Sequence, residues 1–174
     1  MTREVATNLI RKAVQPAESW VDLGAGSGTF SYALAELVGS NGHIWAVDKH
    51  PSLSSRSSSL DFAPITVIKG DFTEKLELPL LDGILMANAL HYVRQQEKFL
   101  RHILYYVDKG GKFILIEYDR KIPNPWIPFP ISRKKGRRLF QQLGLNPIEI
   151  GSTPSQYGNG EIYALWGKKS SKGI

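Results

Sequence analysis

Apolar residues recur along this chain in two alternating patterns, one typical of helices and one typical of strands. Residues 5–14, 30–38 and 99–107 carry apolar side chains at helical spacing, which predicts helices with one buried face. Short apolar runs typical of strands lie at 20–23, 44–47, 65–68, 84–87 and 113–116. Strands that alternate with helices favour a parallel sheet with right-handed crossover connections.

The C-terminal third of the chain is organised differently. Residues 119–131 contain four prolines and predict a long non-repetitive connection, whereas a helix is expected around 132–143. Two final strands follow at 147–150 and 162–167, joined by a loop rich in glycine, serine and proline. Earlier, the serine-dense residues 52–59 carry little apolar surface, so a short weak helix or a loop is expected there.

Length and composition limit the possible functions. A chain of 174 residues fits one domain, and no linker or internal repeat divides it. Because cysteine is absent, disulfides, cysteine-ligated zinc and a thiol nucleophile are excluded, and His43, His50 and His102 lack metal-ligand spacing. No apolar run approaches the ~18 residues that span a bilayer. We therefore expect no metal, no membrane partner and a cytoplasmic location.

The net charge of +6 and the isoelectric point near 9.5 are modest signs of an anionic partner. Much of the excess is local, because five of the six residues 133–138 are Lys or Arg. Such a run is most often a solvated helix face, and few aromatic residues suited to stacking on RNA lie beside it. Contact with RNA through residues 133–138 nevertheless stays open.

The most informative segment is a glycine loop that follows the first strand. The strand ends at the acid Asp22, a glycine then occupies every second position, and an amphipathic helix follows. Gly24 can take the positive φ of a tight turn, while Gly26 and Gly28 let the backbone approach a ligand. Thr29 stands where the dinucleotide-binding pattern G-x-G-x-x-G requires glycine, so a nicotinamide or flavin site is disfavoured.

The spacing of this loop resembles motif I of the class I S-adenosylmethionine (SAM)-dependent methyltransferases. The resemblance implies that the loop lies against the amino-acid and ribose parts of SAM, and that Asp22 anchors the methionine ammonium group. The loop residues so implied in SAM binding are Gly24, Ala25, Gly26, Ser27 and Gly28.

Two further acids follow in the order of that family. Asp48 ends the second strand, where the family's acid hydrogen-bonds the ribose hydroxyls, and Lys49 comes directly after it. Asp71 and Phe72 resemble the family's Gly-Asp-aromatic step. There the acid accepts from the adenine amino group, and the next backbone N–H meets a ring nitrogen. The resemblance therefore implies that all four residues contribute to the SAM site.

The segment after the fourth strand holds the remaining candidates. Asn88 and Ala89 occupy positions that face SAM and the substrate in the family, and His91 follows them. An ordinary imidazole pKa suits a general base, so His91 is the catalytic candidate. The alternative is that His91 only hydrogen-bonds a backbone group beneath the substrate. Residues 108–116 match the family's next turn and fifth strand.

The resemblance spans residues 20–118 with specific motifs and implies the fold. We expect a Rossmann-like three-layer α/β/α sandwich with a mostly parallel seven-stranded sheet and a reversed last strand. One methyltransferase domain then covers residues 1–174, similar to the small methyltransferase-domain families of types 11, 12 and 25. Around the SAM-binding core it has an N-terminal helix within 1–16, a proline-rich loop at 119–131, and a helix with terminal strands at 132–174.

The reaction that the resemblance implies is methyl transfer from SAM, which leaves S-adenosylhomocysteine. We expect a small-molecule acceptor, because residues 119–131 supply a proline-stiffened apolar wall beyond the fifth strand. Two alternatives stay open: an RNA or protein acceptor bound through residues 133–138, and a SAM-binding subunit of a complex without catalytic activity. The motifs identify the methyl donor but neither the acceptor, nor its methylated atom, nor the oligomeric state.

Overall fold

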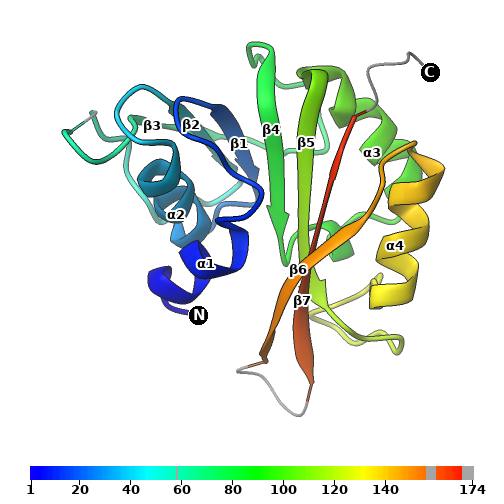
Figure 1. The fold of residues 1–174 in the computed structure, drawn as a ribbon. Coiled ribbons are helices and arrows are strands. Elements are labelled where there is room, and N and C mark those ends of the chain that lie inside the picture. Colours follow the sequence, from blue (N-terminus) through cyan, green and yellow to red (C-terminus); the bar gives the residue numbers. More distant parts are fainter. Residues whose placement is uncertain (58, 156–159, 170–174) are drawn as a thin grey trace.

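A seven-stranded sheet runs through the computed structural model, which describes residues 1–57, 59–155 and 160–169 (Figure 1). The strands lie in the order β3-β2-β1-β4-β5-β7-β6. Their bounds are β1 Ser19–Leu23, β2 His43–Asp48, β3 Ile65–Lys69, β4 Leu81–Ala87, β5 Val107–Tyr118, β6 Ile148–Pro154 and β7 Glu161–Lys168. Neighbours from β3 to β5 pair in parallel, whereas β7 is antiparallel to both β5 and β6. The predicted mostly parallel sheet with a reversed last strand is confirmed.

Helices cover both faces of the sheet, as predicted for a three-layer sandwich (Figure 1). Their bounds are α1 Arg3–Ile10, α2 Thr29–Val38, α3 Gln96–Ile103 and α4 Arg133–Gln142, with short 3₁₀ turns η1 Leu90–Tyr92 and η2 Leu104–Tyr106. Within the described part of the chain, no helix is long and apolar enough to cross a bilayer.

Side chains that alternate along the strands build one apolar cluster on each face. On β5, Phe113 points into the cluster with Leu100 of α3 and Phe140 of α4. The next residue, Ile114, points into the opposite cluster with Leu34 of α2. Because both faces are covered, the strands read as continuous apolar runs rather than as an apolar–polar alternation.

The N-terminal helix is shorter than its apolar pattern predicts. α1 ends at Ile10, and the N–H of Ala13 then bonds back to the Ile10 carbonyl in a tighter turn. Ala17 follows with a φ of 62°, which reverses the chain into β1. The apolar spacing continues beyond the helix because residues of the following turns are also buried.

Among the described residues, the connections from β2 to β3 and from β3 to β4 contain no helix. The strict strand–helix alternation is therefore wrong there, although a loop was one of the two expectations for residues 52–59. The described residues of 52–59, which exclude 58, form a bend and isolated bridges, and residues 72–80 form one short turn followed by irregular chain. Serine density in the first segment leaves no apolar face to bury, so helix formation there gains little from packing. The predicted loop residues 156–159 and terminal residues 170–174 lie outside the described chain.

β5 begins six residues before the predicted apolar run, at Val107. The expected turn at 108–111 is part of this strand, where Gly110 has a φ of 78°. The pairing with β4 shifts register between Leu81 and Gly83, so the irregular segment is accommodated within the sheet.

Gly83 is expected to be indispensable for packing between β1 and β4. A Cβ added there would stand 2.5 Å from three ring carbons of Trp20, its register partner. The indole is fully buried and its Nε1–H donates to Glu18, which fixes the ring. We predict that Gly83→Ala lowers the free energy of unfolding by about 1–3 kcal/mol in urea titrations. Gly160→Ala, whose added Cβ meets no atom of the described residues within 4 Å, is the matched control and should change little.

Candidate functional site

Two hollows open where the sheet order reverses, at the carboxyl ends of β1 and β4. The smaller hollow, of about 210 Å³, borders the glycine loop, and the larger, of about 740 Å³, lies beyond β4 and β5. Asn88 lines both of them. Open α/β sheets bind their ligands in such a crevice, because the chain leaves the two central strands toward opposite faces.

The glycine loop forms the wall of the smaller hollow. All three glycines have positive φ: 85° at Gly24, 54° at Gly26 and 83° at Gly28. A Cβ at Gly24 would stand 2.5 Å from that of Ala89, and one at Gly28 would stand 2.7 Å from Leu53. A Cβ at Gly26 would meet nothing within 4 Å. Gly24 and Gly28 are thus required by packing, whereas Gly26 leaves open space where a ligand can approach the backbone.

Six predicted SAM-site residues line the smaller hollow: Asp22, Gly24, Ala25, Gly26, Ser27 and Asn88. The other predicted residues lie around it without lining it. Gly28 is the N-cap of α2, and Ala89 is buried against Gly24.

Asp48 braces the glycine loop from the end of β2. Its Oδ2 accepts from the N–H of Gly26 at 2.9 Å, and its Oδ1 accepts from the N–H of His50 at 2.8 Å. The Val47 carbonyl accepts from the N–H groups of Gly24 and Ala25. Asp48, the acid predicted to bind the ribose, therefore holds the glycine loop in shape.

Lys49, Asp71 and Phe72 lie beside the ends of β2 and β3. The Lys49 ammonium lies 2.7 Å from the Asp71 carboxylate, which also accepts from Thr73. Burial opposes ionisation of Asp71, but the bonds from Lys49 and Thr73 outweigh it and hold the pKa of this carboxyl below its usual value. Phe72 packs against Phe99, with ring centroids 5.8 Å apart.

Asp22 is a buried carboxylate on the wall of the smaller hollow. Its Oδ2 accepts from the Ser31 hydroxyl at 2.6 Å. Desolvation by burial raises the pKa of Asp22 to about 7; the bond from Ser31 opposes this shift and the nearby charge of Asp48 adds to it. A carboxylate that titrates near neutrality beside a hollow is suited to binding a cationic group.

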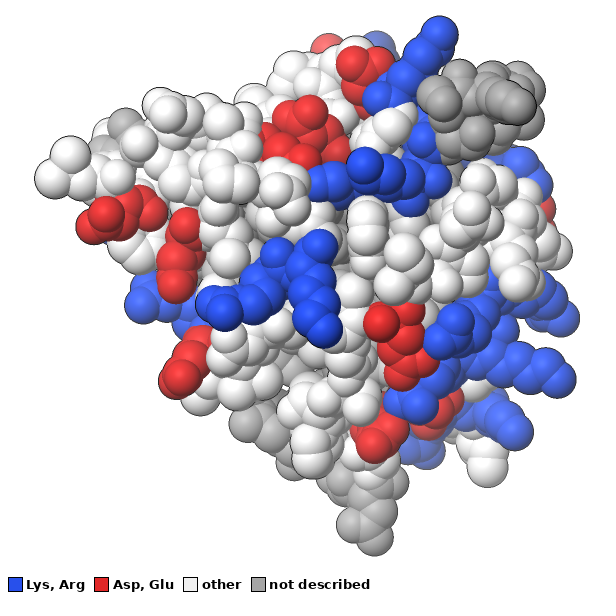
Figure 2. Space-filling model, in the orientation of Figure 1, with Lys and Arg blue, Asp and Glu red and all other residues white. Residues whose placement is uncertain are grey.

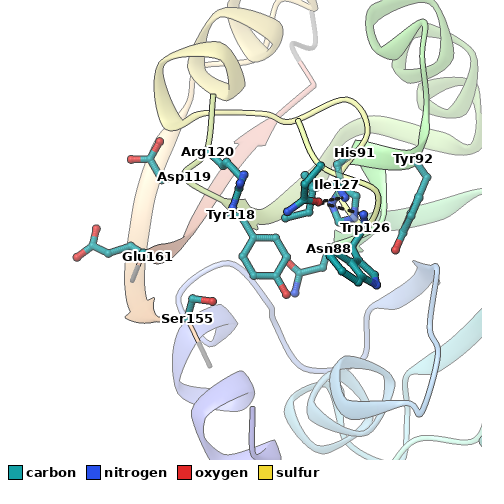
Figure 3. Close-up of a pocket in the computed structure, with 12 residues that line it drawn as sticks. Asn88, His91, Tyr92, Tyr118, Asp119, Arg120, Trp126, Ile127, Ser155 and Glu161 are labelled. Atoms are coloured by element: carbon teal, nitrogen blue, oxygen red, sulfur yellow. Dashed lines mark hydrogen bonds between the residues drawn. The ribbon is translucent and has the colours of Figure 1, made fainter. Parts of the chain in front are cut away.

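The larger hollow is built from four segments that are distant in sequence (Figure 3). The segment after β4, the end of β5, the proline-rich loop and the β6–β7 end contribute its lining. The lining residues are Asn88, His91, Tyr92, Tyr118, Asp119, Arg120, Asn124, Trp126, Ile127, Ser155, Gly160 and Glu161. The loop predicted to form an acceptor-side wall thus borders this hollow, although Trp126 is 74% exposed.

His91, which lines the larger hollow, forms a buried pair with Glu117. The Nδ1 of His91 lies 2.7 Å from Oε2 of Glu117, and the His91 backbone N–H donates to Oε1 at 3.1 Å. Both side chains are almost fully buried. The alternative expectation for His91, that it only hydrogen-bonds a backbone group, is wrong for Nδ1, because its partner is the Glu117 carboxylate. Glu117 was not predicted from the sequence, where its only signal is an acid at the end of the apolar run 113–116.

Asn88 combines two unusual features at the junction of the hollows. Its φ is 51°, and its backbone N–H bonds to the Ile116 carbonyl at 2.8 Å. Its Oδ1 is buried and accepts no hydrogen bond from any described residue. A buried unpaired carbonyl oxygen is costly, so a donor from a ligand is expected to reach it.

The basic run of α4 is largely neutralised along one side. Arg133 pairs with Glu161 at 2.7 Å, and Arg137 pairs with Glu149 at 2.6 Å. Lys and Arg side chains gather at the right of Figure 2, over α4, with acidic side chains beside them. In the described part of the chain, no three His, Cys, Asp or Glu side chains gather to hold a metal ion.

Sequence and structure comparisons relate this chain to known proteins. The family model described as "Methyltransferase domain" matches residues 15–144. The ubiquinone/menaquinone biosynthesis C-methyltransferase UbiE of Chromobacterium violaceum is 26% identical over 125 residues, which are 70% of this chain. That match covers 51% of the relative, so the chain spans about half the length of the curated relatives it matches.

Solved structures share the fold at low sequence identity. The Burkholderia thailandensis 1,6-didemethyltoxoflavin-N1-methyltransferase, solved with 1,6-didemethyltoxoflavin and S-adenosylhomocysteine, has a TM-score of 0.73 and 16% identity. That match covers 97% of this chain and 78% of the other. The YcgJ protein of Bacillus subtilis has a TM-score of 0.70 and 14% identity, covering 96% of this chain and 99% of the other.

The raised pKa of Asp22 predicts a pH-dependent stability. An acid whose pKa is higher in the folded state stabilises the fold fully below its unfolded pKa of 3.8, and this contribution is lost as pH rises to about 7. We predict that the stability of Asp22→Asn relative to the unmutated chain grows between pH 5 and pH 7, by at most about 1.4 kcal/mol per pH unit, and levels off above. Urea titrations across that range measure it.

Asp61→Asn, at an exposed position, is the matched control and should show no such growth. A difference between Asp22→Asn and the unmutated chain that stays constant from pH 5 to pH 8 would contradict the assignment.

Proposed function

The chain belongs to the methyltransferase-domain family of class I SAM-dependent enzymes, and on that premise we propose that it transfers a methyl group from SAM to a small-molecule acceptor. The donor occupies the glycine-loop hollow, and the acceptor occupies the larger hollow. The observation that carries the proposal is Asn88, which lines both hollows and holds a buried oxygen without a partner among the described residues. The two ligands would meet there.

Residues of the smaller hollow fit the chemistry of SAM. The open side of Gly26 leaves room for a ligand against the backbone. Asp22 offers a carboxylate to the methionine ammonium group, and its ionisation is favoured once that cation is present. Asp48, already fixed by two backbone N–H groups, can accept further hydrogen bonds from ribose hydroxyls.

The larger hollow supplies positioning and a base. SAM carries an activated methyl group, so the protein has to orient the acceptor, exclude water and receive a proton. As the acceptor's nucleophilic atom bonds to the methyl carbon and the sulfur takes the electrons of its broken bond, the proton that the acceptor loses passes to Nε2 of His91. Glu117 holds Nδ1 and stabilises the imidazolium that results.

A small, apolar or planar acceptor fits the lining best. Tyr92, Tyr118, Trp126 and Ile127 supply aromatic and aliphatic surface, and a volume of about 740 Å³ lies in the range of small-molecule sites. One compared relative is named for ubiquinone/menaquinone biosynthesis, and one compared structure holds 1,6-didemethyltoxoflavin; both support the same class of acceptor. An RNA or protein acceptor on the basic run is less favoured, because Arg133 and Arg137 are paired with carboxylates.

A methyl group at Gly26 should weaken the binding of SAM. The added Cβ of Gly26→Ala points into the space assigned to the ligand, and we expect calorimetry to show SAM affinity reduced roughly tenfold or more, a loss of about 1.4 kcal/mol. Gly39→Ala is the matched control, because Gly39 also has a positive φ of 67° and open space around it, at the end of α2. Equal SAM affinities in the two variants would overturn the donor site.

The pair of His91 and Glu117 should matter for turnover and not for donor binding. We predict that Glu117→Gln and His91→Gln each lower turnover by roughly 10²–10⁴, with SAM affinity nearly unchanged. Release of S-adenosylhomocysteine, measured against a panel of phenols, amines and carboxylates, reports turnover across a range of pH. The double variant should lose little more than either single variant. Turnover within a factor of two of the unmutated chain would contradict the role of this pair.

A further inference from the structure

The proline-rich loop presents an uncharged apolar tip to solvent. No residue from Ile122 to Ile131 is charged, and Ile122 and Trp126 are 73% and 74% exposed. The tip has a defined shape, because Oδ1 of Asn124 accepts from the N–H groups of Trp126 at 3.0 Å and Ile127 at 2.7 Å. Two large apolar side chains held outward on a shaped turn indicate a surface that meets another apolar phase.

Lysine and arginine side chains line two adjoining hollows beside this tip. A hollow of about 400 Å³ behind the loop has four cations and no acid among its lining residues: Arg94, Arg120, Lys121 and Lys135. The next hollow, of about 550 Å³, lies between α3 and α4, shares two of them, and adds Lys98, Arg101 and Arg138 with the single acid Glu97.

Most of these cations are free to meet an external anion. Arg94, Lys98, Lys121 and Arg138 form no ion pair with any described residue, whereas Arg101 is paired with Glu97. This side of the molecule therefore differs from the other side of α4, where acids neutralise the arginines. The positive charge of the residues that line these two hollows is comparable to the net charge of the whole chain, +6.

We propose that this face docks on an anionic phospholipid surface, with Ile122 and Trp126 in the interface and the cations against the headgroups. Aromatic and aliphatic side chains ringed by Lys and Arg are the composition that binds the boundary between headgroups and acyl chains. The expectation of no membrane partner rested on the absence of a spanning run, and peripheral docking needs none.

A lipid surface fits these residues better than a nucleic acid. Single-stranded nucleic acids bind to aromatic platforms between cations. Here Ile122 has no ring on which a base could stack, and prolines separate it from Trp126. Burial in lipid, in contrast, is favourable for both side chains.

Docking would also define the class of acceptor. Trp126 lines the larger hollow as well as the tip, so a docked molecule would turn the entrance of that hollow toward the lipid. Resting on the proposed function, this geometry points to a lipid-soluble acceptor that enters from the membrane.

Vesicle sedimentation tests the docking without any methyl transfer. The chain should bind vesicles of phosphatidylcholine mixed with phosphatidylglycerol, bind phosphatidylcholine alone weakly, and lose binding at high salt. Ile122→Ser and Lys121→Glu should each lower the partition coefficient about fivefold or more. Neither residue lines the SAM hollow or the acceptor hollow, so SAM affinity in calorimetry should not change.

Two exposed positions far from this face provide matched controls. Leu60→Ser removes a leucine that is 95% exposed near β3, and Lys12→Glu makes the same charge change after α1. Both variants should bind vesicles like the unmutated chain. Equal binding to both vesicle types, unchanged binding of Ile122→Ser, or binding to total RNA in place of vesicles would overturn the docking proposal. If the unmutated chain binds vesicles but does not bind SAM, the proposed function is overturned and the docking proposal is not.

Discussion

The close approach of two loops at the middle of the sheet is the constraint on which the rest of the site depends. After β1 the chain passes through Gly24 to α2, and after β4 it passes through Ala89 to α3 on the opposite face. The two loops are so close that a side chain at Gly24 would collide with Ala89. Because the helices then diverge, the ends of β1 and β4 stay uncovered, and both hollows open there.

Polar groups that are costly to bury gather at the same edge. Asp22 has the Ser31 hydroxyl as its hydrogen-bond donor, and Oδ1 of Asn88 has no partner among the described residues. His91 and Glu117 pair with each other beneath the larger hollow. Most other buried side chains of the strands are apolar, with Lys112, which pairs with Glu18, as an exception. Among the described residues, Thr7 and Arg133 also hold a buried polar atom without a hydrogen-bond partner, but only that of Asn88 borders the two hollows, and this is where a ligand donor is expected.

Local pattern predicted most elements of this fold, because apolar periodicity reports which faces are buried. The glycine loop was also identifiable, since its three positive φ angles require a residue type visible in the sequence. The end of α1 was not predictable in this way, because the turns that follow it are buried as deeply as the helix.

The spacing of residues along the sequence could not predict which side chains from distant segments pair with each other. Glu117 lies 26 residues from His91, and the two meet only because β4 and β5 are neighbours. Contact with RNA through the basic run was left open, yet Arg133 and Arg137 meet acids that β6 and β7 bring beside α4. Both outcomes depend on strand order, which local sequence does not specify.

A crystal structure of the chain with bound S-adenosylhomocysteine tests most directly whether donor and acceptor sites meet at Asn88. We predict that the amino-acid part lies along the glycine loop with its ammonium group at Asp22, that the ribose contacts Asp48, and that the sulfur faces the larger hollow beside Asn88. A ligand bound elsewhere, or one whose sulfur is separated from that hollow by protein, would contradict the two-site arrangement.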